Sequence, residues 1–396
     1  MNRRLIYILT MGIIMASCSD GRLAPKTEQA ERNDISDKTV VLDVEKHMLD
    51  SFPLSKLIKD VRYVQLETSL DACLTLPMNV KNAGGVLYVS DLDEQLFCFD
   101  QNGTFLRRAF QRGKGSGEVL RMYDYDVDDS LLYVLDGARS AIMTYSHDGT
   151  FVACQNLPFR AISFAKQEYG YVFHLAPYSL NNGDNKDLIA VTDEKFNPLY
   201  TAFEYDADNC IPATRTPYFS DGNESLLYAP IYGRSIYSIS EKNVEMLYYL
   251  SFNSPYYEQN KQYEGAKEAA EEGIYYSYNN PIQAGKFLIQ TFSTSKDCKG
   301  TLLINRESNK YVFIKDFVQD TNRIYGFSFE DAKYYDRKTN ELVGFADTYY
   351  TDEHTDEIKE IKASMKDSVA NILIKKSASF SENPLLIFYR LCPDAI

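Results

Sequence analysis

The sequence predicts an all-β fold, a single six-bladed β-propeller of four-stranded antiparallel blades with short helical insertions. Three observations lead to this prediction. A pattern of strands and turns recurs with a period of about 45 residues. Short runs rich in β-branched and aromatic residues continue along most of the chain. Finally, strand-like segments stand near both ends of the chain, where they could close a ring of blades.

The repeat is clearest between residues 86–106 and residues 131–152. Tyr88 aligns with Tyr133 when the two segments are superimposed. Each segment contains an apolar strand, a short polar turn, a second strand, a glycine-containing turn and the start of a third strand. This spacing is typical of the blades of a propeller.

The glycine-containing turns of the two segments are Asn102-Gly103 and Asp148-Gly149. Asn-Gly and Asp-Gly pairs favour two-residue hairpins in which both central residues have positive φ. We therefore expect a tight hairpin at each of these pairs.

Later units are more degenerate but keep the rhythm of strand and turn. One begins near Arg323, and counting gives five or six units, of which the sixth is expected to be shared by both termini. Further strands are expected at 171–175, 188–192, 226–231, 235–240, 246–252, 287–292, 301–305, 311–316 and 342–345, with turns at 193–196 and 306–309.

The two ends of the chain carry the segments that would close the ring. Residues 61–67 alternate apolar and polar side chains, and residues 385–391 form a strongly apolar run. Because an open sheet edge is a template for aggregation, we expect these segments to pair within the last blade. The alternative is an open β-sandwich.

Two stretches interrupt the β pattern. Residues 259–272 and residues 352–369 are rich in Glu, Lys and Ala, which favour helices. We expect short helical insertions there, on one rim of the propeller.

The N-terminus has the features of an export signal. Arg3 and Arg4 precede an apolar run, residues 5–15, that is too short to span a membrane as a permanent helix. Small residues stand directly before Cys18, an arrangement that resembles the bacterial lipobox, in which the cysteine is acylated. An ordinary signal peptide with a chance cysteine is the alternative.

This interpretation divides the chain into three parts. Residues 1–17 are the expected signal peptide, and residues 18–38 are a polar, lipidated stalk with too few apolar side chains to fold. Residues 39–396 form the propeller. The protein is then tethered to the cell envelope through its lipid anchor, which predicts palmitate or a similar acyl group on Cys18. An outer-membrane location is expected, with the leaflet left open.

Charge and cysteine content restrict the classes of partner. The net charge is −14 and there are no basic runs, so we expect no nucleic-acid binding. No Cys-x-x-Cys motif, histidine pair or other pattern of metal ligands is present, and no cofactor is expected. One disulfide is compatible with export, without a defined pair, among Cys73, Cys98, Cys154, Cys210, Cys298 and Cys392.

Three segments resemble the six-bladed β-propeller lipoproteins of Bacteroides-type bacteria, which are related to NHL-repeat propellers. These segments are residues 54–68, the glycine-rich residues 113–118 and residues 382–390. The family's glycine-rich loop usually carries Pro where this chain has Ser116. The resemblance implies an exported, lipidated propeller, but it implies no particular activity.

The glycine-rich loop is one of two candidate ligand sites. It lacks the Gly-Lys-Ser/Thr ending of a phosphate-binding P-loop, and a glycine-rich turn between blades explains its residues. If it binds a ligand, Arg112 and Lys114 would supply charge and the loop amides would supply hydrogen-bond donors.

Tyrosines provide the other candidate site. The chain has 31 tyrosines and no tryptophan. Tyrosine clusters fall in or beside the non-strand insertions, where an apolar ring with a polar tip suits sugar or peptide recognition. The candidate ligand-binding residues here are Tyr256, Tyr257, Tyr275 and Tyr276.

Three functions are compatible with these features. We favour a binding or interaction module of the cell envelope, whose partner is a glycan, a peptide or an outer-membrane protein. The second is a propeller lyase or hydrolase, favoured if His174 and two acidic residues converge on the propeller axis. The third is a structural scaffold. No catalytic motif is present, so an enzyme is the weaker prediction.

Overall fold

The computed structural model describes residues 35–396 with internal gaps. The described ranges are 35–176, 187–204, 218–222, 225–230, 234–252, 275–277, 280–294, 299–318, 320, 332–345 and 383–396. Cys18, Tyr256, Tyr257 and both predicted helical insertions lie outside these residues.

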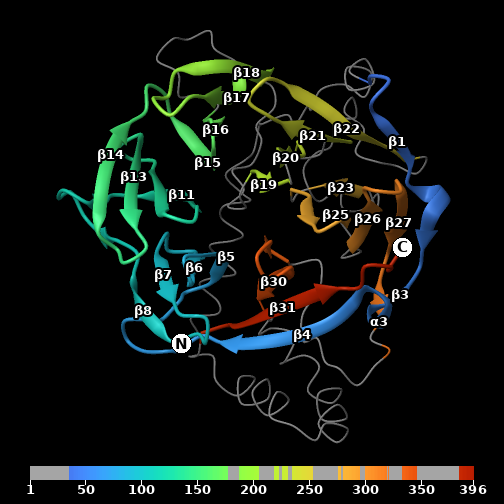
Figure 1. Ribbon diagram of the computed structural model, residues 1–396, viewed down its shortest axis with the longest axis horizontal. Coiled ribbons are helices and arrows are strands. Elements are labelled where there is room, and N and C mark those ends of the chain that lie inside the picture. Colours follow the sequence, from blue (N-terminus) through green and yellow to red (C-terminus); the bar gives the residue numbers. More distant parts are fainter. Residues whose placement is uncertain are drawn as a thin grey trace, which may run out of the picture.

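Six blades surround a central axis, as the sequence predicts (Figure 1). In the first three blades, four consecutive strands are antiparallel, and the first strand lies nearest the axis. They are β5 (Pro77–Ala83), β6 (Val86–Asp91), β7 (Leu96–Phe99) and β8 (Phe105–Arg108); β11 (Met122–Val127), β12 (Leu131–Asp136), β13 (Ala141–Ser146) and β14 (Phe151–Asn156); and β15 (Ala161–Gln167), β16 (Gly170–Leu175), β17 (Asp187–Thr192) and β18 (Pro198–Glu204).

The fourth and fifth blades follow the same plan. The fourth contains β19 (Ser220–Asp221), β20 (Leu226–Tyr228), β21 (Ser235–Ile239) and β22 (Val244–Ser251). In the fifth, β23 (Tyr275–Ser277) and β24 (Ile282–Ala284) both pair with β25 (Phe287–Thr294), which is followed by β26 (Lys299–Asn305) and β27 (Lys310–Ile314).

The sixth blade joins the two ends of the described chain. Its strands are β29 (Tyr334–Asp336), β30 (Glu341–Phe345), β31 (Leu385–Leu391) and β4 (Ile58–Gln65). β31 pairs antiparallel with β4, with Leu386 opposite Val64. The predicted closure by N- and C-terminal strands is therefore confirmed.

An N-terminal strap, residues 40–53, lies outside the later blades, and the sequence does not predict it. Its strand β1 (Val40–Asp43) adds in parallel to β22. The 3₁₀ turn Glu45–His47 leads to β2 (Met48–Leu49), which pairs in parallel with β27. β3 (Phe52–Pro53) pairs with β28 (Phe317–Val318), and the helix α3 (Leu54–Leu57) leads into β4. The strap thus covers the outer edges of two blades.

Contact with the propeller begins before the strap. Ile35, which falls within the predicted stalk, packs against the apolar core between the third and fourth blades. The hydroxyl of Thr39 donates to the carbonyl oxygen of Met246 at 3.1 Å.

The core consists of apolar layers between neighbouring blades. All the residues of the middle strands β6, β7 and β16 are buried, because a blade is covered on both faces. The outer strand β8 exposes alternate residues, and β14 exposes Val152 and Cys154 to Asn156. Tyr88 and Val134 share one apolar layer, which joins the first and second blades.

The Asn-Gly and Asp-Gly hairpins differ from their prediction. Only the glycines have positive φ, 85° at Gly103 and 91° at Gly149. The N–H of Asp100 donates to the carbonyl of Thr104 at 2.9 Å, and that of Gly103 donates to the carbonyl of Asp100 at 3.0 Å. This is a three-residue loop that ends in a left-handed glycine. The Asp100 carboxylate stabilises it by accepting the N–H groups of Asn102 and Thr104, both at 2.8 Å.

A two-residue hairpin occurs instead between β5 and β6. There Gly84 and Gly85 have φ of 58° and 78°, the backbone that a type I′ turn requires.

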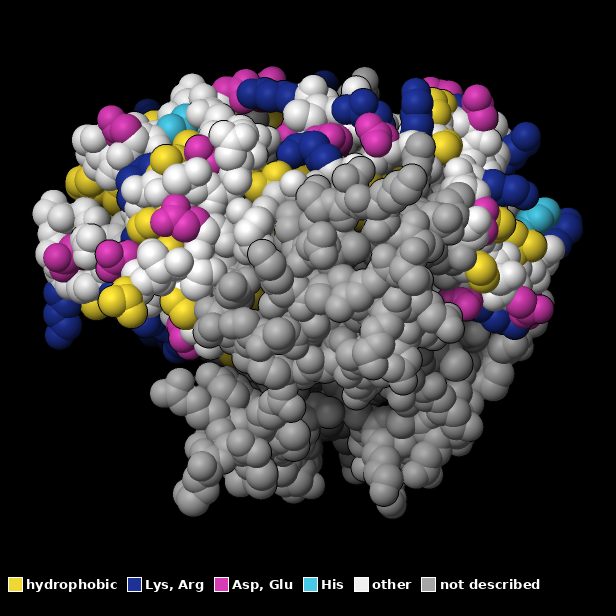
Figure 2. All heavy atoms as spheres, turned by 90° about the horizontal axis from the view of Figure 1, so that it is seen from below, with side chains coloured by type: hydrophobic (Ala, Val, Ile, Leu, Met, Phe, Trp, Pro, Cys, Tyr) yellow, Lys and Arg dark blue, Asp and Glu magenta, His cyan; other side chains and the backbone are white. Residues whose placement is uncertain are grey.

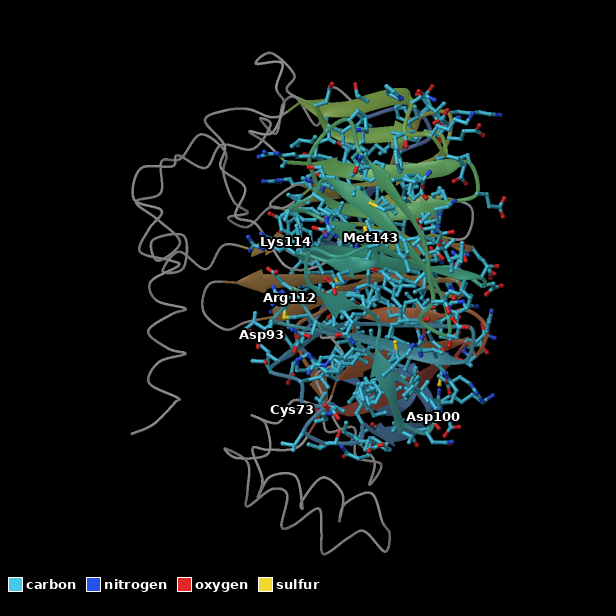
Figure 3. All side chains as sticks on the ribbon, turned by 90° about the vertical axis from the view of Figure 1, so that its left-hand side faces the viewer. Cys73, Asp93, Asp100, Arg112, Lys114 and Met143 are labelled. Carbon is cyan, nitrogen blue, oxygen red and sulfur yellow. The ribbon has the colours of Figure 1, made fainter. Side chains whose placement is uncertain are left out.

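Antiparallel order within the blades gives the propeller two distinct faces. Turns between first and second strands and between third and fourth strands lie on the hairpin face, which includes Asp100. Turns between second and third strands, and the connections between blades, lie on the opposite loop face. Figure 3 shows Asp100 on one side of the ribbon and Asp93, Arg112 and Lys114 on the other.

Candidate functional site

The loop face between the first and second blades gathers two arginines around one acid. Glu94 stands in the β6–β7 turn with a φ of 60°, and the N–H of Glu94 donates to the carbonyl of Asp91 at 3.2 Å. Arg112 ends the short strand β9 (Gln111–Arg112), which pairs in parallel with β10 (Glu118–Val119). Arg121 directly precedes β11 of the next blade.

Both guanidinium groups contact the same carboxylate. Arg112 approaches Glu94 Oε2 at 3.3 Å through Nη2, and Arg121 Nε lies 3.1 and 3.2 Å from the two oxygens. The charge and hydrogen bonds of Glu94 raise the pKa of Arg121 further above its usual value. The arginine side chains remain 51% and 54% exposed, whereas that of Glu94 is 20% exposed. The acid is thus enclosed and the two cations face solvent.

An exposed aromatic ring completes this arginine cluster, which we define as Glu94, Arg112, Arg121 and Tyr123. Tyr123 is 43% exposed. The guanidinium carbon of Arg121 lies 5.3 Å from the centroid of its ring, within the range of a cation–π contact. Gly137 also lies against the ring, and a Cβ at that position would collide with it.

Asp136 positions the Arg121 backbone. This fully buried carboxylate accepts the N–H groups of Leu120 at 2.8 Å and Arg121 at 3.3 Å. It also pairs with Arg139 at 3.3 Å. Because charge-assisted hydrogen bonds are stronger than neutral ones, Asp136 fixes the point where the chain enters the second blade.

The glycine-rich loop is organised around its own acid. Glu118 Oε2 accepts the N–H of Gly115 at 2.7 Å. A Cβ at Gly115 would lie 2.9 Å from the Glu118 carboxyl carbon, and a Cβ at Gly113 would collide with the same group. The N–H of Gly113 donates to Val119 at 3.1 Å. These loop amides are therefore used within the loop, as expected of a structural turn.

The loop carbonyls also have partners from the second blade. Arg139 Nη2 donates to the Gly113 carbonyl at 3.3 Å, and the hydroxyl of Tyr145 donates to that of Gly117 at 3.1 Å. The loop therefore fastens the first blade to the second, and Lys114 projects from it as an exposed side chain.

The structure describes only some of the candidate ligand-binding residues that the sequence predicts. Arg112 and Lys114 share the loop face (Figure 3). The backbones of Tyr275 and Tyr276 lie in β23, opposite Thr294 and Ser293 of β25. Sequence reasoning missed Glu94, Arg121 and Tyr123, which share no local motif with Arg112.

A second polar group lies around the axis on the inner strands. Lys81 of β5 pairs with Asp126 of β11 at 2.7 Å, and both side chains are largely buried. Burial opposes the charged form of Lys81, but Asp126 and Asp124 outweigh it and raise its pKa. Asp126 also accepts the N–H of Lys166 at 2.8 Å. These contacts link three blades near the axis.

Ion pairs cross the axis on the hairpin face. Arg337, in the β29–β30 turn of the sixth blade, pairs with Asp221 of the fourth at 3.0 Å. The neighbouring Lys338 pairs with Asp129 of the second blade. Since these pairs join non-adjacent blades, they partly cover the axis on this face.

His174 lies in the packing between the third and fourth blades. Its side chain is 2% exposed, and its ring centroid lies 4.0 Å from that of Tyr218. Burial lowers the pKa of His174 to about 4, so the ring is neutral at physiological pH. This arrangement does not favour a catalytic site built on His174 and axial acids.

The described residues show no metal centre and no membrane-spanning helix. Within the described ranges, no group of His, Cys, Asp and Glu is arranged to hold a metal ion. None of the helices there is long and apolar enough to cross a membrane. Cys73, Cys98, Cys154 and Cys392 are free thiols. Both signs of charge are interspersed over the described surface seen in Figure 2.

Comparison with protein families gives one match. The model of the DUF5128 family, described as a six-bladed β-propeller, matches residues 29–344. No match is found among curated proteins.

Three solved structures show different degrees of similarity to this chain. A protein of Bacteroides fragilis NCTC 9343 named as exported is 13% identical with a TM-score of 0.68, over 90% of this chain and 99% of that one. A DUF4221-family member from Bacteroides vulgatus ATCC 8482 is 11% identical with a TM-score of 0.49, over 85% and 97%. Virginiamycin B lyase from Staphylococcus aureus is 10% identical with a TM-score of 0.37, over 65% and 74%. The first of these supports the propeller fold, and the other two are too distant to support any inference.

Proposed function

The chain belongs to the DUF5128 family of six-bladed β-propellers, and from that premise we propose that it is an exported, lipid-anchored binding protein. Its loop face captures a carboxylate-bearing ligand, an acidic glycan or a peptide. The observation that carries this proposal is the arginine cluster, in which two half-exposed guanidinium groups share one enclosed carboxylate.

The arginines have unused hydrogen-bonding capacity. Arg112 donates through Nε to the Leu120 carbonyl and through Nη2 to Glu94, and Arg121 directs Nε and Nη2 at Glu94. The Nη1 group of neither arginine donates a hydrogen bond to a described residue, and half of each side chain is in contact with solvent. Guanidinium forks match carboxylates in a bidentate manner, so a ligand carboxylate fits this position.

Tyr123 and Lys114 extend the same surface. The exposed ring of Tyr123 offers an apolar face for a sugar ring or a peptide side chain. Lys114 adds an exposed positive charge on the neighbouring loop. The outermost strands of the blades run in the same direction, so β22 ends on the loop face, like β8 and β14. β22 is the described strand that precedes Tyr256 and Tyr257 in the sequence.

Export and anchoring rest on the N-terminal pattern. Arg3 and Arg4, the apolar residues 5–15 and Cys18 favour a lipoprotein signal. The Bacteroides fragilis protein with the related fold is itself named as exported. Replacing Cys18 with Ala is expected to abolish incorporation of labelled palmitate and to move the protein out of the detergent phase. Unchanged incorporation would contradict the anchor.

A binding experiment tests the ligand class. We expect an oligogalacturonate to bind the full chain, with its neutral methyl ester binding more weakly, in calorimetric titrations at low salt. Arg112→Gln and Arg121→Gln each remove charge-assisted hydrogen bonds, so the Kd is expected to rise about tenfold. A glutamate-rich peptide tests whether the carboxylate or the sugar is recognised.

Arg390→Gln is the matched control. The side chain of Arg390 is 48% exposed and lies 3.7 Å from Glu341. It stands near the end of β31 in the sixth blade, on the hairpin face and not on the loop face. This substitution is expected to leave the Kd unchanged. Equal binding of the acid and its ester, or an equal loss in all three variants, would exclude recognition of carboxylate by the cluster.

A further inference from the structure

We propose that the outer edge of β14 binds an extended segment of a partner protein, which adds to the second blade as a fifth strand parallel to β14. This interaction surface is separate from the loop-face cluster and does not depend on the function proposed there. It is an exposed sheet edge on the outer rim of the propeller (Figure 1).

The propeller already uses this mode of binding on two other blades. The strap strand β1 pairs in parallel with β22, with Val40 opposite Tyr248 and Leu42 opposite Leu250. β2 pairs in parallel with β27 in the fifth blade. The blade geometry therefore accepts an added parallel strand without disturbing the four strands inside it, and strand addition supplies affinity through main-chain hydrogen bonds.

Among the described strands, four outer edges have no added strand, those of β4, β8, β14 and β18, and they differ in composition. β4 carries Lys59, Asp60 and Arg62. β8 carries Arg107 and Arg108. β18 begins with Pro198 and ends with Glu204. Charged residues and proline are the usual protection of a sheet edge against pairing with another chain. The edges of β4, β8 and β18 are therefore protected.

β14 lacks this protection along its own length, and Pro158 follows two residues after its end. Its six residues, Phe-Val-Ala-Cys-Gln-Asn, include no charged residue and no proline. Val152 is 54% exposed, and Cys154 to Asn156 are exposed as well. An uncharged edge of this length is a template for another strand.

The second residue of the outer strand, which is Val152 in β14, indicates the chemistry of the partner. Leu106, Val152 and Leu199 are each the second residue of an uncovered outer strand, and they are 47%, 54% and 46% exposed. The matching residue of the fourth blade, which the strap covers, is Glu245, and it pairs with Lys38 at 3.5 Å. Lys38 stands just before β1, so a residue just before an added strand lies beside the second residue of the outer strand. A partner of β14 should place an apolar side chain there and carry no charge along the paired stretch.

The chain's own N-terminal segment provides the probe. We would use a fluorescein-labelled peptide with the sequence of residues 38–45 and the substitutions Lys38→Leu, Asp43→Asn and Glu45→Gln, together with the same peptide in which Lys38 is kept. Anisotropy titrations use the full chain in detergent. We expect saturable binding of the leucine peptide, weaker binding of the lysine peptide, and slower amide hydrogen exchange at residues 151–156 in the complex.

Val152→Lys is the test substitution, because it adds an edge charge at an exposed side chain that contributes little to the core. The peptide Kd is expected to rise about fivefold or more, with the melting temperature unchanged. Leu106→Lys is the control, since it makes the same change at the matching position of an edge that is already charged. It should leave the Kd within about twofold.

Three results would overturn the proposal. The first is no saturable binding, and the second is exchange protection outside residues 151–156. The third is a concentration-dependent dimer in which β14 is protected without peptide and which Val152→Lys dissolves, because that would identify a second copy of this chain as the occupant.

Discussion

Many acidic side chains in this propeller accept backbone N–H groups instead of facing a ligand. Asp100 stabilises a hairpin, Glu118 fills the glycine-rich loop, and Asp136 holds the start of the second blade. Asp124, whose pKa burial raises, accepts the hydroxyl of Ser163 at 2.5 Å. The abundance of Asp and Glu is therefore partly structural, which explains why no catalytic carboxylate pair could be selected from the sequence.

His174 makes stability depend on pH. Burial lowers its folded pKa to about 4, below the ordinary value of 6.5, so between these values the unfolded chain binds the extra proton. The contribution of neutral His174 is complete above about pH 6.5 and is lost as the pH falls toward about 4, to an extent on the order of 3 kcal/mol.

Urea unfolding measured between these pH values tests this prediction. His174→Phe should flatten the decline in the free energy of unfolding, and the exposed His47→Gln should not. A decline of equal slope in all three proteins would show that His174 does not cause it.

At the scale of elements, the strap and the turns show how local and distant interactions combine. The hairpin turns form where glycine is available, but Asp100 decides the loop type by accepting two N–H groups. The strap has little intrinsic signal, and it is ordered because Leu42 and Val44 are buried in the layer between the fourth and fifth blades. The strap is therefore stabilised by packing against the blades and not by its local sequence.

The alternation along β1 gives a direct test. Leu42 is 1% exposed, so Leu42→Ala is expected to lower the free energy of unfolding by about 2–4 kcal/mol. Val41, its neighbour, is 53% exposed, and Val41→Ala should change stability by less than about 0.5 kcal/mol. Denaturant titrations measure both. Similar small values for the two variants would mean that the strap is not part of the folded core.

At the scale of the whole molecule, the ring is held by one composite blade. β31 stands between β30 and β4, and so joins the C-terminal end to the N-terminal region. Arg62 of β4 strengthens this blade, because it contacts the buried Glu341 of β30 at 2.7 Å and lies 3.5 Å above the ring of Phe388. Because β4 and β31 pair within one blade, the ring of blades has no open end.

Removing residues 385–396 tests the importance of this closure. The shortened chain loses an interior strand of the sixth blade, so we expect the cooperative thermal transition to disappear. A chain that ends at Leu391 keeps β31 whole and should retain the transition. A cooperative transition in the shorter chain would show that the other five blades fold without closure.

The fold was largely predictable from local chemistry. Alternation and apolar runs located most strands, the similarity of residues 86–106 and 131–152 indicated the blade, and residues 61–67 and 385–391 indicated the closure that β4 and β31 provide. These signals lie within short stretches of chain. Only the hairpin type was wrong in this part of the prediction, because it depends on side-chain capping and not on the Asn-Gly pair alone.

The sequence by itself determined a repeating β architecture with joined ends, because strand and turn preferences act between near neighbours. Only the tertiary structure decided which distant side chains meet. It brought Glu94 between Arg112 and Arg121, placed Lys81 beside Asp126, and added the strap to two blade edges while β14 stayed open. Those contacts arise from the packing of one blade against the next, and no short pattern of residues records them.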